Sequence, residues 1–195
     1  GHRPGRAAGE SLAAPLADAV IKTIGAPGFG PDGVVFAATL QTGRGGVTTA
    51  NDAVLLHQTV AGGLTVIARE GDIAPGQDGN PLADSAKFTS FGNPVHGPTG
   101  KLAFIASLKA GSNKSGLFWV NGAAPLRLIA RAGDAAPMLG TFSKFTNLVF
   151  RNTSNGTPIF KAKLASQPIA NVNSATSDGI WALNNAGAVV IVARN

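Results

Sequence analysis

The stretch LIARAGDAAP, residues 128–137, decides how the fold of this 195-residue chain is interpreted. Apolar residues lead into Arg131, and a Gly-Asp pair then indicates a tight turn. The same pattern occurs earlier as VIAREGDIAP, residues 66–75, and its first half closes the chain as IVARN, residues 191–195. A pattern that recurs along a chain indicates a repeat architecture rather than a single chemical site.

Each copy of this corner is preceded by a β-hairpin pattern. Two short apolar runs enclose a turn rich in Gly, Asn or Ala; of these, Gly and Asn tolerate the positive backbone angles of tight turns. The three segments align without gaps and each ends at an arginine: LLHQTVAGGLTVIAR (55–69), LFWVNGAAPLRLIAR (117–131) and IWALNNAGAVVIVAR (180–194). The repeat length is therefore roughly 60 residues.

Two further strand patterns lie upstream of each hairpin. The nearer one carries Phe, Ala and Leu at alternate positions, so these side chains should share one face of a strand. Its members are Phe36, Ala38 and Leu40, then Phe104, Ala106 and Leu108, then Phe160, Ala162 and Leu164. The farther pattern, at 21–28, 88–95 and 142–149, spaces its apolar residues three apart, which predicts a β-bulge or kink near the Gly or Thr that follows.

The last strand of each repeat is apolar on both faces. Strict alternation divides the first copy between the two faces, with Leu64, Val66 and Ala68 on one and Ile67 and Arg69 on the other. The later copies repeat the first of these faces with Leu126, Leu128 and Ala130 and with Val189, Ile191 and Ala193. Apolar residues on both faces predict sheets that pack against a neighbour on each side.

The sequence therefore predicts an all-β protein of three repeats, each a four-stranded antiparallel meander, in a β-propeller-like arrangement. A threefold β-prism-like arrangement is the alternative. The predicted boundaries are an N-terminal extension at 1–17, whose initial Gly-His would be part of a cleavage scar, and repeats at 18–76, 77–140 and 141–195 within one structural domain. Three blades are too few to close a ring, so two chains could form a six-bladed homodimer, or flanking repeats of a longer chain could complete the array.

The repeat signature resembles that of a family of bacterial repeat proteins of uncharacterised function. The resemblance rests on Phe104 and Ala106, on the strand Gly116-Leu-Phe-Trp119, and on the segment Ala-Arg-Ala-Gly-Asp-Ala-Ala-Pro at 130–137, and it covers about 18–195. It implies an extracytoplasmic protein, secreted, periplasmic or at the cell surface, and supplies no catalytic residues. The third repeat departs from the pattern because Asn195 follows its arginine where the Gly-Asp would come.

Composition sets limits on the partners. The formal net charge is +6, but the basic residues are spread singly and Tyr is absent, so no basic and aromatic surface for nucleic acid is predicted. No apolar run approaches the length of about 18 residues needed for a membrane span, and no membrane insertion is expected. The opening GHRPGRAAGE lacks the apolar region of a signal peptide, and the absence of cysteine removes disulfides and thiolate chemistry.

The recurring corners are interpreted as structural. Their residues are Arg69, Gly71 and Asp72, then Arg131, Gly133 and Asp134, and finally Arg194. Arginine at a strand end can pair with a carboxylate or with turn carbonyls, and glycine there can adopt a backbone conformation closed to other residues. The loop with Asp72 and Asp78 is the best calcium candidate, but two carboxylates supply too few of the oxygen ligands that a calcium loop requires. The sequence thus predicts no metal, no cofactor and no catalytic residues.

The histidines and tryptophans are the remaining candidates. His57 aligns with Trp119 and Ala182, and His96 lies in a loop that varies between repeats, so neither histidine marks a catalytic site. Trp181 aligns with Phe118 and is expected in the core. Trp119 lies on the other face of its strand and is the candidate ligand-binding residue, with carbohydrate as the ligand.

Three functional hypotheses follow from these observations. The leading one is a non-catalytic extracytoplasmic binding or interaction module. The second is a hydrolase or lyase acting on polysaccharide, with a site assembled between blades, which the small number of acidic residues disfavours. The third is a structural segment of a longer surface protein. Fold alone does not choose among them, because propellers support both binding and catalysis.

Overall fold

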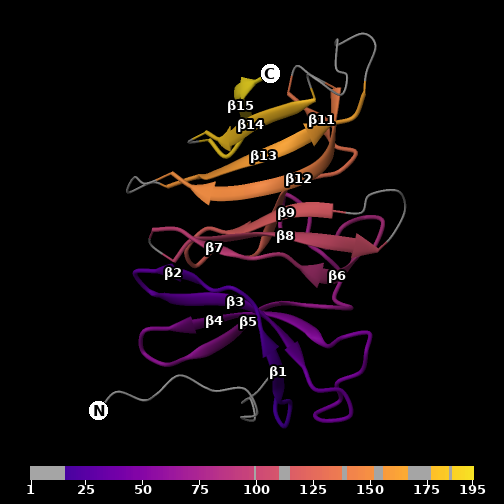
Figure 1. Ribbon diagram of the computed structural model, residues 1–195, viewed down its shortest axis with the longest axis vertical. Coiled ribbons are helices and arrows are strands. Elements are labelled where there is room, and N and C mark those ends of the chain that lie inside the picture. The colour runs from indigo at the N-terminus through magenta and orange to yellow at the C-terminus, as the bar shows by residue number, and fades with distance from the viewer. Residues whose placement is uncertain are drawn as a thin grey trace.

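Three antiparallel sheets are stacked along the long axis of the computed structural model, in the order in which they occur in the chain (Figure 1). The structure describes residues 16–98, 100–109, 115–137, 140–151, 156–166, 177–184 and 186–195. Within these ranges every regular element is a strand, so the predicted all-β class is confirmed. Most of the predicted N-terminal extension at 1–17 lies outside the described residues.

Each sheet has five strands. The first contains β1 (Ile21–Ile24), β2 (Gly28–Gly30), β3 (Gly33–Leu40), β4 (Ala53–Thr59) and β5 (Leu64–Arg69). The second contains β6 (Lys87–Phe91), β7 (Val95–His96), β8 (Leu102–Lys109), β9 (Ser115–Val120) and β10 (Arg127–Arg131). The third contains β11 (Ala135–Ala136), β12 (Gly140–Phe150), β13 (Pro158–Leu164), β14 (Asp178–Leu183) and β15 (Val189–Arg194). In each sheet the main path is the predicted four-stranded meander, with one short additional strand.

The first strand of every meander carries a bulge, which lies between its two apolar residues and not only near the Gly or Thr where the sequence predicted it. Its register shifts between Ile21 and Thr23, between Phe88 and Ser90, and between Phe142 and Lys144. One extra residue between the two apolar positions brings both side chains to the same face despite their spacing of three. In the first two sheets the strand then breaks at Gly25 or Gly92, whereas β12 continues across the matching position with a second register shift between Phe145 and Asn147.

The predicted alternation in the last strand of each meander is wrong. Leu55 pairs with Ala68 and its neighbour Leu56 pairs with Val66, so Ile67 is an extra residue in a bulge. The bulge turns Val66 and Ala68 to opposite faces, and they belong to different clusters of the core. The same shift occurs between Leu128 and Ala130 and between Ile191 and Ala193. Alternation fails here because it assumes an uninterrupted strand.

The core consists of apolar layers between the sheets rather than one central cluster. The layer between the first two sheets joins Val35, Leu55 and Ala68 to the Phe104 face of the second sheet. The layer between the last two sheets joins Ala103, Leu117 and Ile129 to the Phe160 face of the third sheet. The predicted Phe-x-Ala-x-Leu faces are confirmed, because the three residues of each copy lie together in one cluster.

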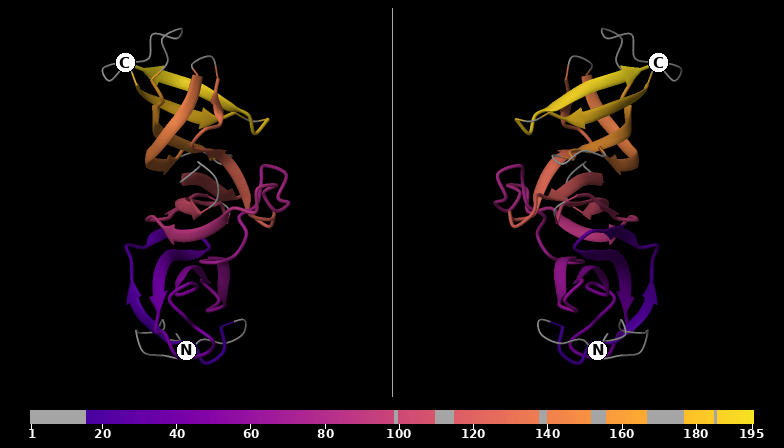
Figure 2. Two further views of the ribbon diagram at one scale, coloured as in Figure 1. Left: turned by 90° about the vertical axis from the view of Figure 1, so that its right-hand side faces the viewer. Right: turned by 90° about the vertical axis from the view of Figure 1, so that its left-hand side faces the viewer.

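A short N-terminal segment covers the outer face of the first sheet. Leu16, Ala19 and Val47 pack on Phe36, Ala38 and Leu40 in a cluster of buried residues. Figure 2 shows the resulting column of sheets, with the first sheet at one end and the third sheet at the other. The first sheet is thus covered on both faces by this chain, as is the second.

Truncation of Phe104 tests this packing, because the Phe104 side chain is fully buried in the layer between the first two sheets. Its ring stacks on Phe118 at 5.6 Å between ring centroids and meets Phe91 edge-on at 5.8 Å. We expect Phe104→Ala to lower the free energy of unfolding by about 3–5 kcal/mol, as core truncations do. Phe29→Ala is the control: Phe29 is exposed, and its removal should change stability by at most about 0.5 kcal/mol. Urea unfolding measures both, and a loss below about 1 kcal/mol for Phe104→Ala would contradict the packing.

Candidate functional site

The corner at Arg131 joins two consecutive repeats. Its guanidinium lies 2.8 Å from a carboxylate oxygen of Asp84 and 3.4 Å from one of Asp134. The other carboxylate oxygen of Asp134 accepts a hydrogen bond from the Arg131 backbone N–H at 2.8 Å. Gly133 has φ +99°, and its N–H donates to the carbonyl of Phe142 at the start of the next meander. These groups bond one another and the next strand, so the corner holds the chain in register.

The first corner uses the same backbone connections with a different side-chain partner. Gly71 has φ +88° and donates to the carbonyl of Phe88, and Phe88 donates back to the carbonyl of Asp72. Arg69 donates through Nε to the Asn51 carbonyl at 2.9 Å. Arg194 lies at the exposed end of β15. Asp78, the calcium candidate paired with Asp72, has both carboxylate oxygens bonded to Asn80.

The ion pair between Asp84 and Arg131 predicts a pH dependence of stability. Burial acts in the opposite direction, but hydrogen bonds from Arg131 and from the Ala86 N–H hold the pKa of Asp84 below its ordinary value. A carboxyl whose pKa is depressed on folding stabilises the protein above its unfolded pKa of about 3.9, and this contribution is lost as the pH falls through the folded value. Asp84→Asn should therefore be less stable than the wild type at pH 7 by at most about 1 kcal/mol, because the pair is partly exposed.

Unfolding by urea at pH 7 and at pH 2.5 measures this effect. The difference between wild type and Asp84→Asn should shrink at the lower pH, where a larger share of the Asp84 carboxyl groups is protonated and uncharged. An equal difference at the two pH values would show that Asp84 acts through packing rather than charge.

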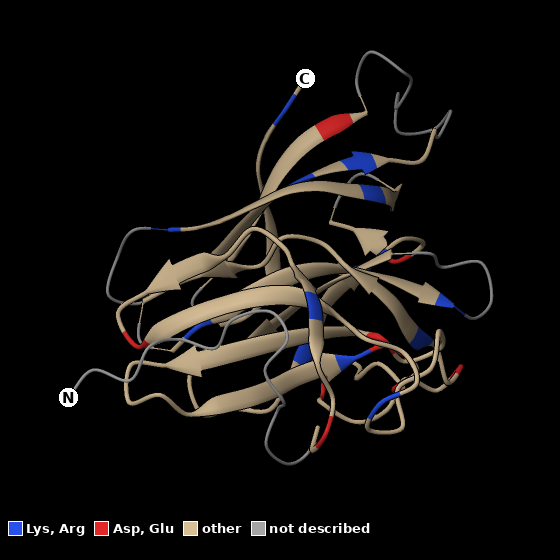
Figure 3. Cartoon of the chain, turned by 60° about the horizontal axis from the view of Figure 1, so that its bottom comes forward, with Lys and Arg blue, Asp and Glu red and all other residues tan. Residues whose placement is uncertain are grey.

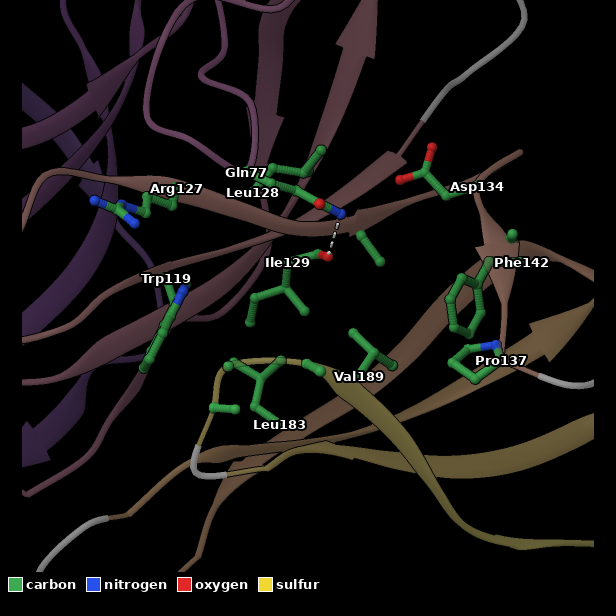
Figure 4. A pocket seen from close by; sticks show the side chains of 15 residues that line it. Gln77, Trp119, Arg127, Leu128, Ile129, Asp134, Pro137, Phe142, Leu183 and Val189 are labelled. Carbon is green, nitrogen blue, oxygen red and sulfur yellow. Dashed lines mark hydrogen bonds between the residues drawn. The ribbon is translucent and has the colours of Figure 1, made fainter.

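A cleft of about 510 Å³ lies between the second and third sheets and contains Trp119 in its wall. Figure 4 shows Trp119 on one side and the third-sheet residues Leu183 and Val189 below it. Trp119 is half-buried, whereas Trp181 is completely buried in the core, as the sequence predicted. The Gln77 amide already donates to the Ile129 carbonyl, drawn as a dashed line. Asp134 is the only acidic residue among the described side chains that line the cleft, so these do not supply the carboxylate pair of a glycoside hydrolase.

Sequence reasoning missed a cluster of Asp32, His57 and His96. Asp32 lies in the turn between β2 and β3, His57 in β4 and His96 in β7, so two repeats contribute. One potential ligand atom from each residue lies within 4.8 Å of the other two, and the imidazole centroids of the histidines are 5.4 Å apart. Burial lowers the pKa of His57, with the nearby Asp32 raising it and His96 lowering it further. The two histidines lie in strands of adjacent repeats and far apart in the sequence, so their spacing along the chain gave no signal.

The outward face of the third sheet exposes apolar side chains. In the first two sheets the same face is covered, and its residues Leu55 and Leu117 are 0% exposed. The matching residue of the third sheet, Ile180, is 40% exposed. Its exposed apolar neighbours on this face are Val149, Val190 and Val192. Figure 3 shows that charged residues are distributed over the chain. On this face Lys161 pairs across the strands with Ile180, and Lys163 pairs with Asp178 at one end of the strands; the Asp178 carboxylate lies 3.5 and 3.7 Å from the two lysines.

Comparison with known proteins places the chain in a family. A model described as a family of unknown function (DUF7453) matches residues 7–135 and matches again at 78–195. The chain belongs to this family. The two overlapping matches agree with an uncharacterised repeat family, while the bacterial origin and secretion implied by the earlier resemblance stay predictions. No curated protein and no solved structure matches the chain significantly. The described part of the chain also contains no helix long and apolar enough to cross a membrane.

Proposed function

We propose that this member of the DUF7453 family is a non-catalytic interaction module, and that its binding surface is the outward face of the third sheet. The observation that carries the proposal is the exposure of Ile180 at a position that is fully buried in both preceding repeats. Strands that are apolar on both faces favour burial of both, because removing apolar surface from water stabilises a contact by about 25 cal/mol per Å². The exposed face is thus a sheet-packing surface available to a partner.

The partner that we propose is a second copy of this chain. The third sheet offers one apolar face, while the opposite end of the column is closed by Leu16 and Ala19. Two copies can therefore pair through the same face around a twofold axis, which is the commonest symmetry of soluble homo-oligomers. Lys163 and Asp178 lie at one end of the face, where a polar rim of an interface belongs, and Asp178 also pairs with Lys161, which lies beside Ile180. Closure into a six-bladed ring would also require the N-terminal segment to leave the first sheet.

Light scattering after size exclusion tests this pairing. The wild-type chain should have a mass near twice 19.6 kDa, and the dimer fraction should rise with concentration. Val192→Lys places a charge on the apolar face and should give a monomer, because burying an unpaired charge is costly. Val60→Lys is the matched control: Val60 is exposed on a turn of the first sheet, so this variant should remain a dimer. A monomeric wild type, or a Val192→Lys variant that still forms the dimer, would overturn the proposal.

Carbohydrate binding in the Trp119 cleft is a second candidate function. It is favoured by a half-buried indole in a cleft of about 510 Å³, since the face of an indole can stack on a sugar ring. It ranks second because Gln77 and Asp134 already bond to protein groups. Titration of soluble oligosaccharides should shift the tryptophan fluorescence of the wild type but not that of Trp119→Phe, in which buried Trp181 remains as an internal reference. An unchanged wild-type spectrum across a set of neutral and acidic oligosaccharides would eliminate this candidate.

An extracytoplasmic location completes the proposal. It is supported only by the resemblance of the repeat signature to secreted and surface-associated repeat proteins. Fractionation of the source cells with an antibody against this protein would test it, and recovery in the cytoplasmic fraction would contradict it.

A further inference from the structure

We infer that Asp32, His57 and His96 form a binding site for a divalent transition-metal ion of the Zn²⁺ class, which clamps the first repeat to the second. Two imidazoles and one carboxylate are a common ligand set for such ions. The inference is separate from the proposed pairing, because the cluster lies between the first and second sheets and not on the outward face of the third.

The hydrogen bonding of His96 leaves a lone pair directed at Asp32. The Nδ1 atom of His96 lies 2.8 Å from the Gly97 carbonyl, which can only accept, so Nδ1 carries the proton. In the neutral ring Nε2 is then an acceptor, and it lies 2.9 Å from Oδ1 of Asp32, itself an acceptor. Two acceptors at this distance need either a proton or a metal ion between them. A metal-bound histidine commonly donates its other N–H to a backbone carbonyl, as His96 does here.

The three ligand atoms are buried and have no hydrogen-bond partner. They are Oδ1 of Asp32, Nε2 of His57 and Nε2 of His96. The His96 side chain is 0% exposed, and such an unsatisfied polar atom is costly unless it meets a proton or a metal. Around Zn²⁺, ligand atoms at about 2.0–2.2 Å from the metal lie roughly 3.3 Å from one another. The observed separations, 2.9 Å for one pair and at most 4.8 Å for all, need only small side-chain rotations to reach this geometry.

The backbone leaves space for the cluster at glycine positions. A Cβ atom at Gly30 would overlap the His96 ring, and one at Gly100 would lie 2.9 Å from Oδ2 of Asp32. The Asp32 side chain remains 38% exposed, which leaves a solvent-facing side where water can complete the coordination of the ion.

Comparison of the two inter-repeat contacts shows that the cluster is specific to the first. His57 aligns with Trp119, and His96 aligns with Phe150, whose ring lies over Gly97 as the His96 ring lies over Gly30. At the second contact these positions are therefore aromatic and apolar, and both residues pack against the core there. Trp and Phe fill these positions at the second contact, so the packing of two sheets does not require polar residues there. Packing therefore does not explain why the first contact has two histidines and an aspartate.

Binding of Zn²⁺ to the purified full-length protein tests the inference. Isothermal titration with ZnCl₂ should give one ion per chain with micromolar or tighter affinity, and Zn²⁺ should raise the melting temperature. When Co²⁺ replaces Zn²⁺, the protein should show the visible absorption of a four- or five-coordinate Co²⁺ ion with nitrogen and oxygen ligands. Asp32→Asn, which is nearly isosteric, and His57→Ala should each weaken binding by about tenfold or more.

Two further variants keep the test decisive. His2→Ala removes the remaining histidine of the chain, outside the cluster, and should bind Zn²⁺ as the wild type does. His96→Phe copies the residue at the matching position 150 and should fold but lose the site. The inference is overturned if the wild type takes up no Zn²⁺, if Asp32→Asn and His57→Ala bind as tightly as the wild type, or if His2→Ala alone abolishes binding.

Discussion

Packing of sheet upon sheet is the interaction on which this structure depends. Each meander is apolar on both faces, because Phe, Ala and Leu alternate on one face of its second strand while residues such as Leu55 and Leu117 fill the other. A sheet of this kind loses stability for each apolar face that is left in water. The corners with positive-φ glycines at 71 and 133 bring each new strand back onto the previous sheet, so the stack grows repeat by repeat. The exposed face of the third sheet and the histidine cluster are both consequences of how these layers meet.

Much of this architecture could be predicted from the sequence, since repetition multiplies a weak local signal. The Phe36, Phe104 and Phe160 patterns are each short, but their agreement in register identified the strand, its buried face and the repeat length. The spacing of three in the first strand likewise predicted a bulge, and the structure has one there. The extra residues at Ile67 and Ile129 were missed, because a bulge within a uniformly apolar strand leaves no mark in its composition.

The candidate sites were less predictable for a physical reason. Trp119 and Trp181 could be separated because they occupy neighbouring positions of the equivalent strand in two repeats and so face opposite ways. Asp32, His57 and His96 instead come from a turn and from strands β4 and β7 of two repeats, and only the stacking of β7 beside β2 brings them together. Alignment of the repeats even counted against them, because Trp119 and Ala182 stand at the positions that match His57, and the segment around His96 varies between repeats. A residue that departs from a repeat pattern is better interpreted as a candidate site than as a sign that the position accepts any side chain.

If burial of both faces stabilises each sheet, the second sheet should be the most stable and the third should open more easily in dilute, monomeric protein. Amide hydrogen exchange followed by mass spectrometry measures this directly, since β8 and β9 match β13 and β14 strand for strand and are paired on both sides in the same way. The account predicts that β13 and β14 exchange through openings of lower free energy than β8 and β9. Equal protection of the two pairs of strands would show that packing on both faces is not what stabilises the stack.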